Sequence, residues 1–243
     1  MACSLCYGER MKPLDATDWL RLVRPGSRVF IGGGACVPFH LVGLMLDVAE
    51  TFQDVEIVHI HGLGETPWIA PKWRDILRTN SFFLTPDLRD AVERGQADYT
   101  PCAMSEVSSL FEQGPLPLDV ALIQVSPPDA EGWCSHGLSV DVVKCAAKCA
   151  RTVIAQINPK MPRTGGDRGI SIQQIDYYVT HASALPEMPK SVLDDRYERM
   201  GRYAAQLIED GSTIQLGLGE APDAVARALK KHQHLGVHSG LFQ

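Results

Sequence analysis

The sequence is short of the features by which membrane proteins and nucleic-acid-binding proteins are recognised. It contains no apolar run long enough to span a bilayer. It has no basic run, and its formal net charge of −6 has the wrong sign for a nucleic-acid-binding surface. The first residues have neither the charged nor the apolar segment of a secretory signal. We therefore expect neither a nucleic acid nor a membrane as partner.

Signatures of several common enzymes are also missing. Glycine-rich turns are present, but no lysine follows them at the spacing of a phosphate-binding P-loop. Val37 and Pro222 stand where a dinucleotide-binding turn needs a small residue. No G-x-S-x-G elbow occurs. Nicotinamide, P-loop and serine-hydrolase chemistry are therefore disfavoured.

Cysteines are few and odd in number. Seven cysteines scattered along the chain predict free thiols in a reducing compartment, so we expect a cytoplasmic protein. Cys3 and Cys6 have redox or zinc spacing, but no second pair follows, and we favour a frayed terminus without a metal site. Cys145 and Cys149 are predicted to be small core residues of a helix.

A stretch that occurs twice is the strongest positive feature. Residues 26–34 read GSRVFIGGG, and residues 211–219 read GSTIQLGLG. Each copy follows apolar residues at helical spacing, which are Ala16, Trp19, Leu20 and Val23 before the first copy and Met200, Tyr203, Ala204 and Leu207 before the second. Each copy predicts a helix, a buried strand, a glycine turn, a helix and a second strand.

The repeat predicts two similar units. We expect a first α/β domain over residues 1–188 and the beginning of a second unit over residues 189–243. Because the second copy stops just after its second strand, we expect this chain to be the front part of a longer polypeptide. The alternative is a natural half that works with a partner chain.

Strand and helix patterns alternate between the two copies. Strands are expected at 29–31, 55–60, 119–125, 152–157 and 177–179. Helices are expected at 15–23, 38–50, 86–95, 105–112, 140–149, 191–210 and 223–231. The run at 119–125 is apolar on both faces, as in a central strand of a parallel sheet. The pattern predicts an α/β protein whose mostly parallel, open sheet is flanked by helices.

Functional residues of such sheets lie on loops after the carboxyl ends of strands. The candidates are the two glycine turns and the loops 126–137 and 158–167. A glycine turn lets backbone N–H groups approach an anion near a helix N-terminus, although it can also serve packing alone. His59 and His61, with Glu65 nearby, are open to two interpretations. A metal site lacks a defined third ligand, so buried, hydrogen-bonded histidines are favoured.

Four motifs occur in order along the chain. They are S-P-P-D-x-x-G-x-x-S-x-G at 126–137, Q-x-N-P-x-M-P-R-T-x-G-D at 156–167, G-x-G-x-x-P-x-A-V at 217–225 and G-V-H-S at 236–239. Together they resemble the acetyl-CoA hydrolase/transferase family, which includes 4-hydroxybutyrate and acetate CoA-transferases. The resemblance runs from about Asp15 to Phe242 and implies two similar α/β halves.

The resemblance implies covalent catalysis by a glutamate. In the transferases this carboxylate attacks an acyl-CoA, forms an anhydride and then holds CoA as a glutamyl thioester, while backbone N–H groups stabilise oxyanions. The glutamate follows a His-Ser or His-Thr pair, and here that position is Gly240. Gly165 stands where a histidine is common. The catalytic carboxylate is thus missing at its usual place.

The resemblance also implies which residues contact the substrates. The turn Gly217-Leu218-Gly219 is the candidate for an oxyanion or thioester contact, and Gly32, Gly33, Gly34 and Pro38 would line the carboxylate side of a cleft. Further substrate- or CoA-binding residues are expected on the loops 126–137 and 158–167 and at the position of the missing glutamate. They are Ser126, Asp129, Ser135, Asn158 and Gly240.

We therefore expect a CoA-transferase-like protein that handles a small acyl-CoA and a carboxylate between two similar halves. Coenzyme A thioester is expected as substrate, with no covalently bound cofactor. One alternative is a thioester hydrolase without a glutamyl-CoA intermediate, and another is a non-catalytic homologue that binds an acyl-CoA or a partner. An exposed half-cleft predicts a homo-oligomer, or a missing C-terminal half that covers it.

Overall fold

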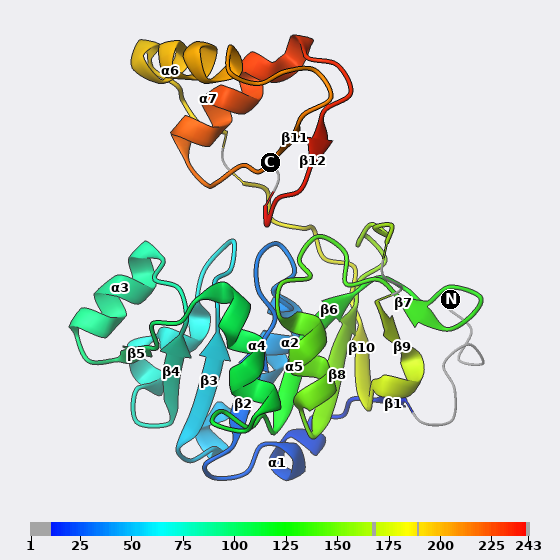
Figure 1. The fold of residues 1–243 in the computed structure, drawn as a ribbon. Helices are drawn as coiled ribbons and strands as arrows, with labels where there is room; N and C mark the ends of the chain where they lie inside the picture. Colours follow the sequence, from blue (N-terminus) through cyan, green and yellow to red (C-terminus); the bar gives the residue numbers. More distant parts are fainter. Residues whose placement is uncertain (1–10, 167–168, 189, 242–243) are drawn as a thin grey trace. The chain divides into compact units, whose positions relative to one another are not determined.

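The chain forms two compact units in a computed structural model, which describes residues 11–166, 169–188 and 190–241 (Figure 1). Unit 1 is Met1–Pro186 and unit 2 is Glu187–Gln243. Cys3, Cys6 and Asp167 lie outside the described residues. In the part of the chain that is described, no helix has both the length and the apolar character that a membrane crossing requires.

Unit 1 is built on a sheet of eight parallel strands. Their order across the sheet is β1-β10-β8-β6-β2-β3-β4-β5, and every neighbouring pair is parallel. The strands are β1 (Lys12–Pro13), β2 (Arg28–Ile31), β3 (Val55–His59), β4 (Leu77–Ser81), β5 (Ala97–Tyr99), β6 (Val120–Val125), β8 (Thr152–Ile157) and β10 (Tyr177–Thr180). The prediction of a mostly parallel α/β fold is confirmed.

The core lies on both faces of this sheet. Every residue of β6 is buried, as the apolar run predicted. Alternate strand residues point to opposite faces, so Phe30 and Val58 join one apolar cluster while Ile31 and Ile57 join another. Helices α4 and α5 cover the first face, and α1 and α2 cover the second (Figure 1).

Most helices of unit 1 are shorter than predicted, whereas α4 covers the whole of its predicted range. They are α1 (Asp18–Leu22), α2 (Phe39–Leu46), α3 (Pro86–Glu93), α4 (Met104–Glu112) and α5 (Val143–Cys149). Hydrogen-bonded turns replace the predicted first residues of α1, because the Asp15 carboxylate accepts the Thr17 N–H at 2.9 Å. Beyond α2, the short 3₁₀ helix Ala49–Thr51 takes the end of the predicted helix.

Several strands were not predicted. Strands β4 and β5 lie at one edge of the sheet, and β7 (Trp133–Cys134) pairs antiparallel with β9 (Ile170–Ser171). Strand β4 was not recognised from hydrophobic residues because Thr79, Asn80 and Ser81 are polar although they are buried. Their polar groups are satisfied inside the protein; for example, Asn80 donates to Glu56 at 3.2 Å.

Unit 2 has the element order that the repeat predicted. Helix α6 (Asp195–Ala205), strand β11 (Thr213–Ile214), helix α7 (Glu220–Ala228) and strand β12 (Gly236–Val237) follow one another, and β11 pairs parallel with β12. The predicted helix 191–210 is shortened to α6, which begins where Asp194 accepts the Arg196 and Tyr197 N–H groups. Helix α7 begins before the predicted residue 223 and passes into the 3₁₀ turn Leu229–Lys231.

One expectation about burial in unit 2 is wrong, because strand β11 was expected to be buried, yet Thr213 is exposed. The apolar stripe of α6 and the turn after it is exposed as well, with Met200 at 41% and Tyr203 at 67% on α6 and with Leu207, just beyond its last residue, at 86%. Helix α6 instead contacts α7 through Gly201, where an added Cβ would collide with the Ala224 carbonyl. Unit 2 therefore leaves an apolar helix face uncovered.

Candidate functional site

The sheet of unit 1 has a switch point between β2 and β6. From β2 the chain adds β3, β4 and β5 on one side, whereas β6, β8, β10 and β1 lie on the other. In open α/β sheets, ligands bind outside the carboxyl ends of the strands at such a point. Here the glycine turn 32–34 follows β2 and the loop 126–137 follows β6, so two of the predicted loops begin at adjacent strand ends.

The glycine turn at the switch point is buried and tightly packed. The Gly34 N–H donates to the His61 carbonyl at 2.8 Å, and Leu63 N–H donates to the Gly34 carbonyl at 3.0 Å. A Cβ on Gly33 would lie 2.6 Å from the His61 carbonyl oxygen. Gly34 has φ 58°, and a Cβ there would collide with the Ser139 hydroxyl. These glycines are therefore required by packing.

A carboxylate lies over the same turn. One Asp141 oxygen would be 3.1 Å from a Cβ on Gly33, and the other accepts the Val143 N–H at 3.0 Å. The side chain is open to solvent, yet surrounding protein removes enough hydration to raise the pKa of Asp141 above its usual value, against the lowering effects of backbone N–H groups and His61. Asp141 is thus an accessible carboxyl group beside the glycine turn whose protonated form is favoured more than in an ordinary aspartate.

Arg163 joins the two loops that follow β6 and β8. Its Nη1 donates to the carbonyls of Pro127 and Trp133, each at 3.0 Å, and to the Ser126 hydroxyl at 3.3 Å. Its Nη2 donates to the Asp129 carboxylate at 2.8 Å. One guanidinium therefore holds the backbone of loop 126–137 in place from loop 158–167.

The two serines of the first motif stabilise the same loop. The Ser126 hydroxyl accepts the Ser135 N–H at 2.9 Å. The Ser135 hydroxyl accepts the N–H groups of Gly137 at 3.1 Å and Thr164 at 3.3 Å. Both serines are buried. In this structure their hydroxyls are engaged in shaping the loop.

An amide network lies beneath the switch point. The Gln124 carbonyl oxygen accepts from the side-chain amides of Gln156 at 3.0 Å and Asn158 at 2.9 Å. Asn158 also donates to the Ser183 carbonyl at 2.9 Å. Gln156 accepts the Leu41 N–H at 3.1 Å in the first turn of α2. The network ties β6 and β8 to the helix that follows the glycine turn.

His59 is a buried histidine. It is 1% exposed, its Nδ1 lies 3.1 Å from the Ile31 carbonyl oxygen, and its ring contacts the Trp68 ring at 5.0 Å. His61 lies at the rim, 5.5 Å from the Phe83 ring. Within residues 11–166, 169–188 and 190–241, no group of three or more metal-binding side chains is present.

The burial of His59 predicts a loss of stability in acid. Loss of hydration lowers its pKa from 6.5 to about 4. Between these values the unfolded chain binds a proton that the folded chain does not, so the free energy of unfolding falls as pH is lowered, by about 3 kcal/mol in total. Urea unfolding measured between pH 7 and 4 should show this slope, and His59→Gln should flatten it. An unchanged slope in the variant would assign the acid sensitivity to other groups.

Arg163 gives a second prediction. Arg163→Ala should lower the free energy of unfolding by about 1–3 kcal/mol, because hydrogen bonds from a charged donor to four acceptors are lost, and should speed proteolysis within loop 126–137. Asp129→Asn is the matched control, since this exposed ion pair alone contributes about 0–1 kcal/mol. Equal effects of the two variants in urea unfolding and limited proteolysis would contradict the role given to the guanidinium.

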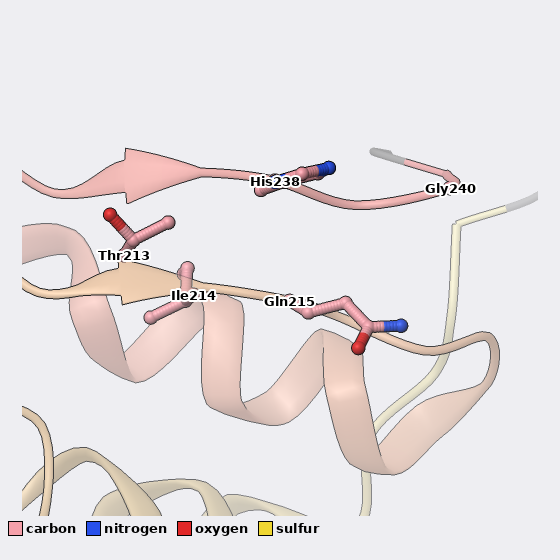
Figure 2. A pocket seen from close by; sticks show the side chains of 5 residues that line it. All are labelled: Thr213, Ile214, Gln215, His238 and Gly240. Atoms are coloured by element: carbon pink, nitrogen blue, oxygen red, sulfur yellow. The ribbon is translucent and has the colours of Figure 1, made fainter.

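A hollow of about 410 Å³ lies in unit 2, lined by Thr213, Ile214, Gln215, His238 and Gly240 (Figure 2). It is bordered by β11 and by the segment that follows β12. The Ser239 hydroxyl joins these two segments, because it accepts the Leu216 N–H at 3.3 Å and donates to the Leu216 carbonyl at 2.7 Å. A Cβ on Gly240 would meet no atom within 4 Å.

The predicted site residues divide between the two units. Unit 1 holds one buried set around the switch point, consisting of Gly32, Gly33, Gly34, Pro38, Ser126, Ser135 and Asn158, together with the exposed Asp129. Unit 2 holds Gly217, Leu218 and Gly240, which are exposed, and the half-buried Gly219.

Sequence reasoning missed several residues of the site. Gln156 and Arg163 belonged to the motif at 156–167 but were given no role, and Asp141 and Gln124 were not singled out at all. A signal existed for the glutamines, since a polar residue inside an otherwise apolar, buried strand must find partners. Asp141 carried no comparable signal.

The fold and its loops identify the class of protein. It is an α/β protein with an open parallel sheet and with glycine- and proline-rich loops at the switch point. Residues 7–194 match the model of the acetyl-CoA hydrolase/transferase N-terminal domain. The chain belongs to the acetyl-CoA hydrolase/transferase family. The family resemblance inferred from the motifs is confirmed.

Individual relatives agree with this assignment. The chain is 44% identical to a 4-hydroxybutyrate coenzyme A transferase of Clostridium kluyveri, over 89% of this chain and 50% of the relative. It is 36% identical to a succinyl-CoA:acetate/propanoyl-CoA:succinate CoA transferase of Fasciola hepatica, over 90% of this chain and 46% of the relative. The chain thus spans about half the length of these curated relatives.

Solved structures share the fold. A 4-hydroxybutyrate CoA-transferase of Porphyromonas gingivalis superposes with a TM-score of 0.79 at 34% identity, over 96% of this chain and 55% of that one. RipA of Yersinia pestis superposes with a TM-score of 0.85 at 25% identity, over 98% of this chain and 57% of that one.

Proposed function

We propose that the protein handles a small acyl-CoA and a carboxylate, with coenzyme A thioester as substrate, in a cleft between two similar α/β halves. The observation that carries the proposal is the 44% identity to a 4-hydroxybutyrate coenzyme A transferase. The relatives are named for the transfer of coenzyme A, and the loop motifs of this chain are those on which the family resemblance rests.

We assign the proposed contacts by their position and exposure. The turn Gly217-Leu218-Gly219 precedes α7 and is largely accessible, so its backbone N–H groups are available to stabilise a thioester oxyanion. The glycine turn 32–34 and Pro38 are buried, so their proposed role is to support the residues that contact the substrate carboxylate. Asp141 and His61 border this turn, and their more accessible side chains are the groups that would contact the substrate.

Gly240 favours hydrolysis as the second candidate. A glycine has no carboxylate to attack the thioester, so no glutamyl-CoA intermediate forms at this position. In hydrolysis, water attacks the thioester carbonyl, the C–S bond breaks, and a carboxylic acid and the CoA thiol leave. A homologue that binds an acyl-CoA without turnover remains the third outcome of the same assay.

One assay separates these functions. The full-length protein is incubated with acetyl-CoA or butyryl-CoA, with and without an acceptor carboxylate, and free CoA and new acyl-CoA are quantified. New acyl-CoA that requires the acceptor supports transfer, and CoA release without acceptor supports hydrolysis. Binding of acyl-CoA without either product supports the binding homologue. Failure to bind any acyl-CoA or CoA would overturn the proposal.

The exposed stripe of α6 supports a proposal about partners. An apolar helix face of this kind is normally covered, and the chain spans about half the length of its relatives. We propose that further α/β polypeptide covers the face in a longer protein, and a second copy covers it in the isolated chain.

The stripe predicts self-association of the isolated chain. Leu207 is 86% exposed, so Leu207→Ser should shift the mass measured by light scattering toward the monomer with little change in the free energy of unfolding. Leu20→Ser is the matched control, because Leu20 is an exposed leucine at 56% on α1 of unit 1. A monomeric parent, or equal effects of the two variants, would contradict this role of the stripe.

A further inference from the structure

Two cysteines of unit 1 lie close together outside the proposed site. Cys145 and Cys149 are one turn apart on α5, and their sulfur atoms are 3.9 Å apart. They were expected to be small core residues, but both are half-buried free thiols at the edge of the apolar cluster beneath α4 and α5. The Cys145 thiol also donates to the Ser108 carbonyl at 3.6 Å, and the two residues lie on one side of the helix.

Helix geometry argues against a disulfide between them. Cβ atoms one turn apart on an α-helix are separated by about 5–6 Å. A disulfide needs a Cβ separation of about 3.5–4.5 Å. Closing the bond would require α5 to deform, whereas an ion held between the two sulfur atoms makes a longer bridge that the helix accommodates.

The ligand set selects the class of ion. Thiolates are soft ligands that favour Cu(I), whereas Mg²⁺ and Ca²⁺ favour oxygen. Structural zinc sites use four protein ligands, and among the residues that the structure describes no cluster of three or more metal-binding side chains exists. The pair alone suits an ion that is satisfied by two sulfur ligands.

We propose that Cys145 and Cys149 form a two-thiolate binding site for a soft cation of the Cu(I) class. On binding, each thiol releases its proton to solvent and forms one sulfur–metal bond, with no change of oxidation state. Burial, together with Cys149 and Glu112 of α4, raises the pKa of the Cys145 thiol to about 11, so the ion must displace a proton that this thiol holds firmly, while the negative charge of Glu112 attracts a cation. Neither cysteine takes part in the proposed CoA chemistry, so this proposal does not depend on the proposed function.

Competition for Cu(I) tests the site. The protein carries Cys3→Ser and Cys6→Ser, because these residues offer a second pair of thiols, and is titrated anaerobically with Cu(I) held by the coloured chelator bicinchoninate. We expect the protein to withdraw one equivalent of Cu(I). Either Cys145→Ser or Cys149→Ser should weaken binding by more than the roughly 10–100-fold typical of losing an outer-shell partner.

Cys102→Ser is the matched control. Cys102 is a half-buried thiol that packs against the same apolar cluster, and its S–H donates to the Ala103 carbonyl at 3.4 Å. Its loss should leave Cu(I) binding unchanged. Circular dichroism verifies that each serine variant is folded.

A second probe detects the spacing of the thiols directly. Phenylarsine oxide bridges two neighbouring thiols with loss of water, so intact-mass measurement should show one arsenical per chain in the parent and none in either single variant. The proposal is overturned if Cu(I) stays with the chelator, if both single variants bind as the parent does, or if air oxidation removes two hydrogens by joining Cys145 to Cys149.

Discussion

Replacing Gly240 by glutamate is expected to raise acceptor-dependent CoA transfer by at least about 100-fold, the lower end of what a positioned catalytic group contributes. The backbone leaves room for the change, because a Cβ at Gly240 meets no atom within 4 Å. The position lines the hollow of unit 2 beside His238. A carboxylate there would attack the thioester carbonyl, forming a mixed anhydride and releasing CoA thiolate. The thiolate would then attack the glutamyl carbonyl, so that the acyl group leaves as a carboxylate and CoA is held as an enzyme thioester.

The test compares Gly240→Glu with Gly240→Gln in the full-length protein. The two side chains have nearly the same size, but the amide is not a nucleophile. We expect exchange of CoA between an acyl-CoA and an added carboxylate, and a CoA adduct by intact mass, with the glutamate variant alone. Equal rates for the two variants would mean that the position does not act as the family resemblance implies.

Gly33→Ala is expected to lower the free energy of unfolding by about 3 kcal/mol, the upper end of the cost of overpacking a core. The added Cβ would lie 2.6 Å from the His61 carbonyl oxygen, which is backbone and is held by the Gly34 N–H. The turn or the end of β3 must move. Because Asp141 lies over the same glycine, its carboxylate would be displaced too.

Gly43→Ala is the matched control. Gly43 lies within α2, is exposed, and offers open space to a Cβ. The same chemical change should raise the free energy of unfolding by about 1 kcal/mol through helix propensity. Urea unfolding of both variants tests the pair, and a Gly33→Ala protein within about 0.5 kcal/mol of its parent would show that the turn adapts.

The sequence predicted those parts of the fold that local residue patterns determine. Apolar runs predicted β6 and β8 because both faces of these strands are buried. Thr85 and Pro86 predicted the start of α3, since a cap residue followed by proline is a local signal. Strand β4 was missed because its buried residues are polar, and their hydrogen bonds run to other strands.

The sequence predicted which loops form the candidate site, but it did not predict the side-chain contacts between them. Glycine and proline motifs located the loops that follow the strand ends, because those residues are needed for turns. The partners of Arg163 lie 30 or more residues away in sequence, and no single-sequence pattern fixes such pairs. Asp141 acquires its environment from Gly33 and His61, which precede it by far more than a helical turn. Contacts of this kind depend on strand order.

The amides of Gln124, Gln156 and Asn158 have a consequence for the chemistry above them. None of the three carries a proton that is gained or lost between acid and alkaline conditions, and none carries charge that salt can screen. The scaffold between β6, β8 and α2 is therefore expected to keep its shape whatever the pH and whatever the charge of a ligand bound above it. The ionisable groups are instead Asp141, His61 and the Asp129–Arg163 pair, which lie in the loops above this network. Substitutions there are therefore expected to change ligand recognition without disturbing the amide network.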